Sequence, residues 1–192
     1  MTILLLGLVI FFSAHALRIF APDWRARQRD RLGELLWKAL YSLVSIAGFA
    51  LIVWGFGLAR VEPVVLWQPP HWLARVTELL TLPAFILLLA AYVPRNRIKA
   101  AVGHPMLLAV KIWAFAHLLA NGRVHDLVLF GSFMIWAAID FATARRQDRV
   151  AGKAPETGTV VGDVVVVVAG IGFWAVFAMV LHGWLIGVKP FG

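Results

Sequence analysis

Residues 103–122 read GHPMLLAVKIWAFAHLLANG. The segment is apolar enough to enter a membrane, but it also carries four polar side chains, those of His104, Lys111, His117 and Asn121. A polar group in hydrocarbon is unfavourable unless it is paired, and such residues usually mark a functional site. We therefore expect a membrane-embedded helix here that holds the functional residues.

The composition of the whole chain also indicates a membrane protein. Of the 192 residues, 61% are hydrophobic and the mean hydropathy is +0.84, whereas soluble domains average about 45–50% apolar residues. The net charge of +8 does not indicate nucleic-acid binding, because the cations flank the apolar runs instead of forming one patch. The absence of cysteine excludes disulfides, thiolate metal sites and cysteine nucleophiles.

Six apolar stretches approach the ~20 residues that a helix needs to cross the ~30 Å hydrocarbon core. Backbone groups in lipid must find hydrogen bonds within their own segment, so these stretches are predicted to be helices. The predicted fold class is all-α, an integral membrane bundle of six transmembrane helices in a single domain over residues 1–192. The predicted spans are Ile3–Phe20, Lys38–Leu58, Trp72–Tyr92, Pro105–Asn121, Val124–Ala144 and Val164–Val188.

The orientation follows from the distribution of lysine and arginine. Most of the 18 cations lie in the connections 18–38, 93–103 and 145–163, which are on one side of the six predicted spans. Basic loops stay in the cytoplasm, so both termini are predicted to be non-cytoplasmic. In a bacterium the lipid bilayer would be the cytoplasmic (inner) membrane. The connection 145–163, with Lys153 and Pro155, is interpreted as a flexible cytoplasmic loop.

Two histidines of different spans are predicted in the middle third of the bilayer. At ~1.5 Å per residue, His15 and His117 each lie ~18 Å from the membrane edge that their helix enters, and their heights differ by about 6 Å. Two imidazoles at similar depth can bind one metal from opposite sides, as axial nitrogen ligands bind haem iron. The alternative for each histidine is a hydrogen bond between helices.

Two further residues share a helical face with His117. Trp113 and Asn121 stand four residues before and after it. Asn121 is a candidate to orient a neighbouring polar group, either the imidazole or a haem propionate, and Trp113 is a candidate to line the porphyrin. Together with His15 and His117 as metal ligands, these residues form the predicted cofactor-binding set.

The remaining polar candidates allow structural interpretations as well. His104 is either functional or an interfacial cap before Pro105, and it lies roughly 20 Å along the helix from His117. Lys111 and Asp140 are expected to pair, because both lie within ~10 Å of the cytoplasmic edge. Of the other histidines, His71 and His125 are expected in solvated loops and His182 near the outer edge of the last span.

The motifs of the quoted segment resemble those of the NnrU family of six-helix membrane proteins. That family shows a His-Pro-Met start, a Trp-Ala-x-Ala-His-Leu core and an Asn-Gly end, which here are residues 104–106, 113–118 and 121–122. Residues 11–15, Phe-Phe-Ser-Ala-His, look like the family's first helix, so the resemblance covers nearly the whole chain. One departure is Gly103, where many relatives have arginine.

The resemblance implies a haem protein. The family is similar to the plant and cyanobacterial 15-cis-ζ-carotene isomerase, a haem b membrane enzyme whose iron-ligating histidines align with His15 and His117. The family is also linked to nitrite and nitric oxide metabolism in denitrifying bacteria. The implied function is therefore redox-gated cis–trans isomerisation of a hydrophobic polyene, or nitric oxide binding at the iron.

Two functions of other classes stay open. A non-enzymatic accessory or assembly factor would have a respiratory or denitrification enzyme as its membrane partner, with the histidines as hydrogen bonds between helices. A small transporter would use Lys111, Asp140 and Glu78 along a polar path. The sequence assigns no catalytic residue, and it carries no nucleophile elbow, phosphate-binding loop or zinc protease motif.

Overall fold

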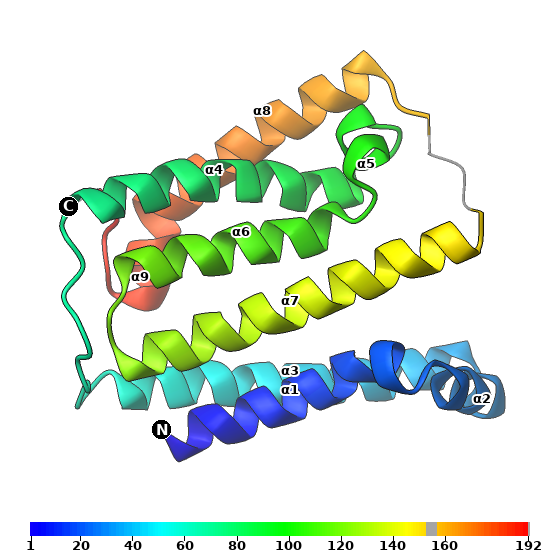
Figure 1. Cartoon of the computed structure of the whole chain (residues 1–192), viewed down its shortest axis with the longest axis horizontal. Coiled ribbons are helices and arrows are strands. Elements are labelled where there is room, and N and C mark those ends of the chain that lie inside the picture. The colour runs from blue at the N-terminus through cyan, green and yellow to red at the C-terminus, as the bar shows by residue number, and fades with distance from the viewer. Residues whose placement is uncertain (153–156, 192) are drawn as a thin grey trace. The chain divides into compact units, whose positions relative to one another are not determined.

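The computed structural model describes residues 1–152 and 157–191. Lys153 and Pro155 of the predicted cytoplasmic loop lie outside the described residues. The chain forms two compact units, and both consist of helices (Figure 1). The first unit comprises Met1–Leu66 and Arg123–Ser132, and the second comprises Trp67–Gly122 and Phe133–Gly192.

Within residues 1–152 and 157–191, five helical segments are long and apolar enough to cross a membrane, so the chain is a multi-pass membrane protein. The sixth predicted span is helix α6, Pro105–Ala120, which has only 16 residues. A helix of that length rises about 24 Å, less than the ~30 Å hydrocarbon core, so a full crossing by α6 stays a prediction. The five segments are α1 (Thr2–Phe20), α3 (Glu34–Ala59), α4 (Trp72–Tyr92), α7 (Val124–Val150) and Val160–Ile186.

Some helices extend beyond the apolar run that predicted them. Helix α3 begins about one turn before the predicted start at Lys38, and α7 continues past the predicted end at Ala144. Hydropathy locates the part of a helix that lies in hydrocarbon, whereas the backbone hydrogen bonds continue into polar sequence. The predicted spans therefore understate the length of α3 and α7.

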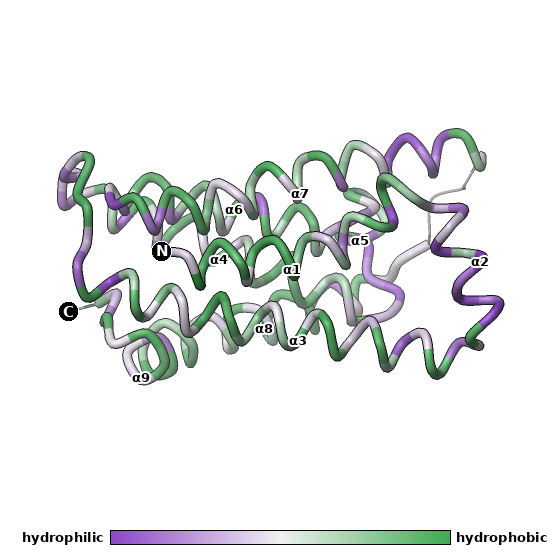
Figure 2. The backbone as a smooth tube through the Cα atoms, turned by 90° about the horizontal axis from the view of Figure 1, so that it is seen from below, coloured by the Kyte–Doolittle hydropathy of each residue, from purple (hydrophilic) through white to green (hydrophobic). Residues whose placement is uncertain are grey.

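Two predicted connections contain helices of their own. Helix α2 covers Pro22–Leu32 and α5 covers Arg97–Val102. Pro22 occupies the first turn of α2, where its fixed φ favours the helix and its missing N–H is no loss. Asn96 caps α5, because its side-chain oxygen accepts a hydrogen bond from the Lys99 backbone N–H at 2.6 Å. Figure 2 shows α2 as a largely hydrophilic helix, unlike the spans.

In the first unit, α1 and α3 pack closely through glycines. A Cβ added to Gly7 would lie 2.6 Å from the Ile52 backbone nitrogen, and one added to Gly48 would lie 2.7 Å from the Phe11 backbone nitrogen. Small residues allow such backbone contact between membrane helices. Leu4 is fully buried in this unit.

In the second unit, α4 packs against both α6 and α8 (Val160–Val176). The Thr77 hydroxyl of α4 donates to the Ala116 carbonyl of α6 at 2.8 Å. The Trp174 indole N–H of α8 donates to the Thr81 hydroxyl of α4 at 3.1 Å. Each of these hydrogen bonds joins polar groups of two apolar helices, and such bonds help to hold membrane helices together.

The last predicted span contains a change of helix type. Helix α8 passes through a π-helical turn, η1 (Phe177–Leu181), into the short helix α9 (His182–Ile186). Gly187 ends α9 in the left-handed conformation, with φ of 77°. The single helix predicted as far as Val188 is therefore helical as far as Ile186, with one wider turn that no local sequence signal indicates.

The loop before α4 is held by main-chain hydrogen bonds to the turn between α6 and α7. The Trp67 N–H donates to the Gly122 carbonyl at 3.2 Å, and the Val124 N–H donates to the Val64 carbonyl at 3.0 Å. A Cβ on Gly122 would overlap the Trp67 carbonyl. The turn therefore requires glycine at residue 122 for steric reasons.

Candidate functional site

His15 is fixed in one tautomer by its own helix. Its Nδ1 lies 2.8 Å from the Phe11 carbonyl oxygen, one turn earlier in α1. A carbonyl only accepts hydrogen bonds, so Nδ1 carries the proton and donates it. In a neutral imidazole the lone pair is then on Nε2, which is the atom that binds a metal.

Aromatic rings flank the His15 imidazole within the first unit. The Phe11 ring stacks on it at a centroid distance of 4.0 Å and an interplanar angle of 22°, and the Tyr41 ring of α3 lies at 5.3 Å. Phe11 therefore supplies both the carbonyl that orients the imidazole and a ring that covers one of its faces. The close approach of Gly48 to Phe11 holds this turn of α1 against α3.

His117 shows the same arrangement in the second unit. Its Nδ1 lies 2.8 Å from the Trp113 carbonyl oxygen, so this imidazole also donates from Nδ1 and carries its lone pair on Nε2. The Trp113 ring is tilted by 50° at 5.2 Å from the imidazole, and the Phe133 ring packs edge-on against Trp113 at 5.7 Å. The two predicted metal ligands thus share one local geometry, a histidine bonded to the carbonyl of an aromatic residue four positions earlier.

Asn121 ends α6 and contacts His117 through the main chain. Its side-chain nitrogen donates to the His117 carbonyl oxygen at 2.8 Å, which satisfies one of the carbonyls exposed at the helix end. The hydrogen bond in the structure is therefore to the backbone of His117 and not to its imidazole. A role for Asn121 toward a haem propionate stays a prediction.

His104 occupies the N-cap position of α6, but its side chain makes no capping hydrogen bond. Its Nε2 instead lies 2.8 Å from the Asp148 Oδ2, on the part of α7 that extends beyond the predicted span. The Phe141 ring packs edge-on against the imidazole at 6.3 Å. Sequence reasoning missed Asp148 because the predicted helix ended at Ala144, and a longer α7 would have placed this carboxylate one turn further on.

Lys111 contacts the residue of α7 that follows Asp140. The Lys111 ammonium lies over the Phe141 ring, 5.1 Å from its centroid, which is a cation–π contact. Asp140, the residue before that phenylalanine, is only 4% exposed. Their predicted ion pair stays a prediction.

His125 is not a solvated loop residue, and that prediction was wrong. It is 1% exposed, and its Nε2 lies 3.6 Å from Oδ1 of Asp126, which is 4% exposed. The Phe56 ring of α3 packs edge-on against it at 5.2 Å. Helix α7 begins at Val124, bonded to Val64, so His125 faces the interior of the first unit instead of a loop.

The described residues contain no group of three or more histidine, aspartate or glutamate side chains arranged to hold a metal ion. The predicted ligand set of two imidazoles is the kind that haem uses, because the porphyrin supplies the other four iron ligands. His182 also donates from Nδ1, to the Val188 carbonyl at 2.7 Å. It follows the π-helical turn directly, and such turns are frequent at functional sites.

The comparison with known families agrees with these residues and their spacing. The model of the family described as NnrU protein matches residues 3–190, nearly the whole chain. The chain belongs to the NnrU family. The resemblance stated from the His-Pro-Met, His-Leu and Asn-Gly motifs is therefore confirmed, and both candidate ligands of this NnrU protein lie inside the matched range. No curated protein and no solved structure matches the chain significantly.

Proposed function

We propose that this NnrU-family membrane protein binds haem b, with His15 and His117 as the axial ligands of the iron. One observation carries the proposal: each imidazole donates its Nδ1 proton to a carbonyl four residues earlier, at 2.8 Å in both cases. Metal-binding histidines almost always donate their other ring N–H in this way, which fixes the tautomer and makes the ligating nitrogen more basic.

The residues around the two imidazoles suit a porphyrin. Phe11, Tyr41 and Trp113 place aromatic rings beside them, and a flat apolar macrocycle packs well against such rings. The donor set is neutral imidazole, the usual protein ligand of haem iron.

His15 and His117 would hold the haem, and the bound group would supply redox-active iron chemistry toward a polyene double bond or nitric oxide. The protein's own contribution would be to fix the tautomer of each imidazole, with the lone pair on Nε2, and to place aromatic rings beside it. We favour isomerisation of a hydrophobic polyene over a reaction with general acid–base steps. A hydrophobic polyene can reach the imidazoles from the bilayer, and aromatic rings lie beside both of them.

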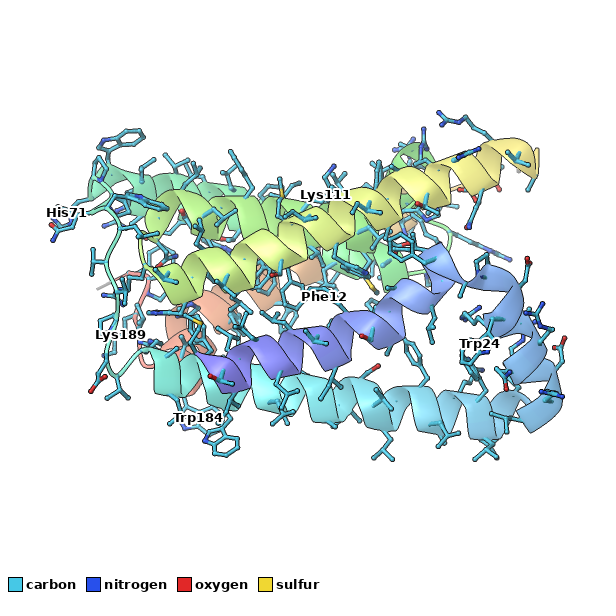
Figure 3. All side chains as sticks on the ribbon, turned by 60° about the horizontal axis from the view of Figure 1, so that its bottom comes forward. Phe12, Trp24, His71, Lys111, Trp184 and Lys189 are labelled. Atoms are coloured by element: carbon cyan, nitrogen blue, oxygen red, sulfur yellow. The ribbon has the colours of Figure 1, made fainter. Side chains whose placement is uncertain are left out.

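The test is the absorption spectrum of the protein purified in detergent, before and after dithionite. We expect a Soret band and a reduced spectrum typical of two histidine ligands, with one haem per chain. His15→Ala and His117→Ala should each change the haem content and the spectrum. His71→Ala is the control, because His71 lies in the exposed loop before α4 (Figure 3).

Three outcomes contradict the proposal. If neither alanine variant changes haem content, the histidines are not the ligands. If the wild-type protein is colourless after purification with haem supplied in the medium and co-purifies with a respiratory enzyme, the accessory function is favoured instead. If only one variant loses the two-histidine spectrum, the iron has a different second ligand.

A further inference from the structure

We infer that the first unit binds the phosphate headgroup of an anionic phospholipid in a basic pocket between α2 and α3. The pocket has a volume of about 260 Å³. Pockets that enclose drug-sized ligands measure ~300–1,000 Å³, so this one suits a headgroup better than a whole lipid. The inference does not depend on haem binding.

One face of each helix forms the pocket. Helix α2 contributes Arg25 and Arg29, which are one turn apart, and α3 contributes Glu34, Lys38 and Tyr41 along its first two turns. Residues four positions apart lie on the same side of a helix, so these side chains converge. The pocket is therefore built by regular secondary structure and not by a loop.

The charge of the pocket favours an anion. Its lining holds three cations, Arg25, Arg29 and Lys38, and one carboxylate, Glu34. The Glu34 carboxylate is already paired, because the Lys38 ammonium lies 2.6 Å from it, one turn along α3. Asp30 lies outside the lining, 3.8 Å from the Arg29 Nε. Asp30 forms an ion pair with Arg29, but within the lining the cations outnumber the carboxylate by two, and guanidinium groups match phosphate oxygens in pairs.

Aromatic residues at the pocket indicate the membrane–water interface. Trp37 lines the pocket, and Trp24 of α2, which is labelled in Figure 3, packs edge-on against Trp37 at a centroid distance of 6.2 Å. Tryptophan and tyrosine are enriched at the level of lipid headgroups. The α3 residues of the pocket lie in the first turns of the candidate membrane span Glu34–Ala59. A phosphate that reaches the pocket from the adjacent bilayer is therefore that of a lipid.

The position of the pocket fits the side of the membrane that carries anionic lipid. Helix α2 lies in the predicted cytoplasmic connection 18–38, the most basic part of the chain. Basic segments next to a span attract anionic lipids, and basic pockets beside membrane helices hold their headgroups. The pocket would bind a headgroup at defined residues. The experiment must therefore distinguish binding in the pocket from the general attraction of basic residues to anionic lipid.

The experiment compares two pairs of arginines on the same helix. Arg25→Gln with Arg29→Gln removes the pocket cations, whereas Arg27→Gln with Arg31→Gln removes the same charge from residues outside the lining. The full chain in detergent is titrated with short-chain phosphatidylglycerol, phosphatidylcholine and inorganic phosphate, and bound lipid is measured by native mass spectrometry. Circular dichroism and thermal unfolding show whether each variant is folded.

We expect the pocket pair to weaken phosphatidylglycerol binding about thirtyfold, because each basic residue near an anionic headgroup contributes about a fivefold factor. The control pair should change it less than about threefold. Wild-type protein should not bind phosphatidylcholine. It should keep its bound phosphatidylglycerol when inorganic phosphate is added in excess.

Four results would overturn the inference. Equal losses in both pairs would mean general attraction to the membrane surface without a site, and no loss in either would mean no headgroup site. Displacement of the lipid by inorganic phosphate would assign the pocket to the free ion. Loss of haem with unchanged lipid binding would assign the arginines to a cofactor carboxylate, which also separates this inference from the proposed function.

Discussion

The surroundings of His15 and of His117 differ although the two imidazoles are held in the same way. Both donate from Nδ1 to the carbonyl of an aromatic residue four positions earlier. The His15 ring is stacked flat on Phe11 at 4.0 Å, whereas the Trp113 ring is tilted against His117 at 5.2 Å. His15 lies within a long helix, while His117 lies in the last turn of α6.

The comparison separates two constraints on each histidine, one from the backbone and one from neighbouring side chains. The tautomer of each histidine is set by the backbone, so it survives changes of side chain. The orientation of each ring is set by its aromatic neighbour and by helix packing. His15 depends on the contact of α1 with α3, and His117 depends on the contact of α4 with α6. The following predictions test whether the two histidines respond separately to changes in those contacts.

The largest expected effect is loss of haem when an imidazole is removed. His15→Ala and His117→Ala should each lower the haem content of purified protein by about tenfold or more, because even changes in the residues that support a metal ligand cost 10–100-fold in affinity. The pyridine haemochrome assay measures the ratio of haem to protein. His182→Ala should retain haem, and a loss there comparable to that of His15→Ala would show that the ligand pair has been wrongly assigned.

Replacing a glycine at a close helix contact with alanine should destabilise the unit that contains it. A methyl group at Gly48 would press on Phe11, and one at Gly170 would lie 2.8 Å from the Ile86 Cα. Overpacking of this kind costs about 1–3 kcal/mol, so Gly48→Ala and Gly170→Ala should lower the thermal unfolding midpoint in detergent. Gly48→Ala should also lower haem content, because Phe11 carries the carbonyl that orients His15.

The chain provides a matched control for each of these glycines. Gly57 in α3 and Gly172 in α8 have open space where a Cβ would lie. Alanine favours a helix over glycine by about 1 kcal/mol, so Gly57→Ala and Gly172→Ala should leave the unfolding midpoint unchanged or raise it. Equal destabilisation by all four variants would mean that glycine packing is not what joins these helices.

A smaller effect is expected from the hydrogen bond next to His117. Thr77→Val removes the hydroxyl that donates to the Ala116 carbonyl at 2.8 Å. Hydrogen bonds between membrane helices contribute about 0.6 kcal/mol on average, so the free energy of unfolding in mixed micelles should fall by about that amount. Thr77→Ser keeps the hydroxyl and should behave like wild type. A drop of the same size in both would trace the effect to the lost methyl group.

The smallest effect should come from the rings beside the histidines. Phe11→Leu and Trp113→Leu leave the carbonyl bonds in place and remove aromatic contacts worth about 0.5–1.5 kcal/mol. Haem release to a competing haem-binding protein should speed up by less than about tenfold, and more for the stacked ring than for the tilted one. Phe20→Leu at the exposed end of α1 is the control. The reverse order would show that stacking does not hold the His15 ring.

The apolar part of the fold could be predicted from the sequence. Helices α1, α4 and α6 begin and end within one residue of the predicted spans, because in them the apolar run coincides with the helix. Helix α2 was missed because its sequence is polar, although Pro22 was a visible start signal. The π-helical turn at Phe177–Leu181 has no local signal in the sequence.

For the candidate site, the sequence predicts residues better than contacts. The aromatic residues four positions before His15 and His117 were visible, and the carbonyl bonds follow from helical spacing. Asp148, the partner of His104, could not be predicted, because it lies on α7 beyond the apolar run. The burial of His125 depends on main-chain pairing of Val64 with Val124, which no side-chain pattern encodes.

Gly122 bears on how haem-binding relatives should be recognised. Its lack of a side chain is required by the Trp67 carbonyl, and Asn121 bonds the end of its own helix. The geometry of this turn is therefore sufficient to account for the Asn-Gly pair. If the proposed function holds, a homologue that keeps the pair but has exchanged either imidazole should preserve the architecture and lose the pigment, so a survey for pigmented members must score His15 and His117 first.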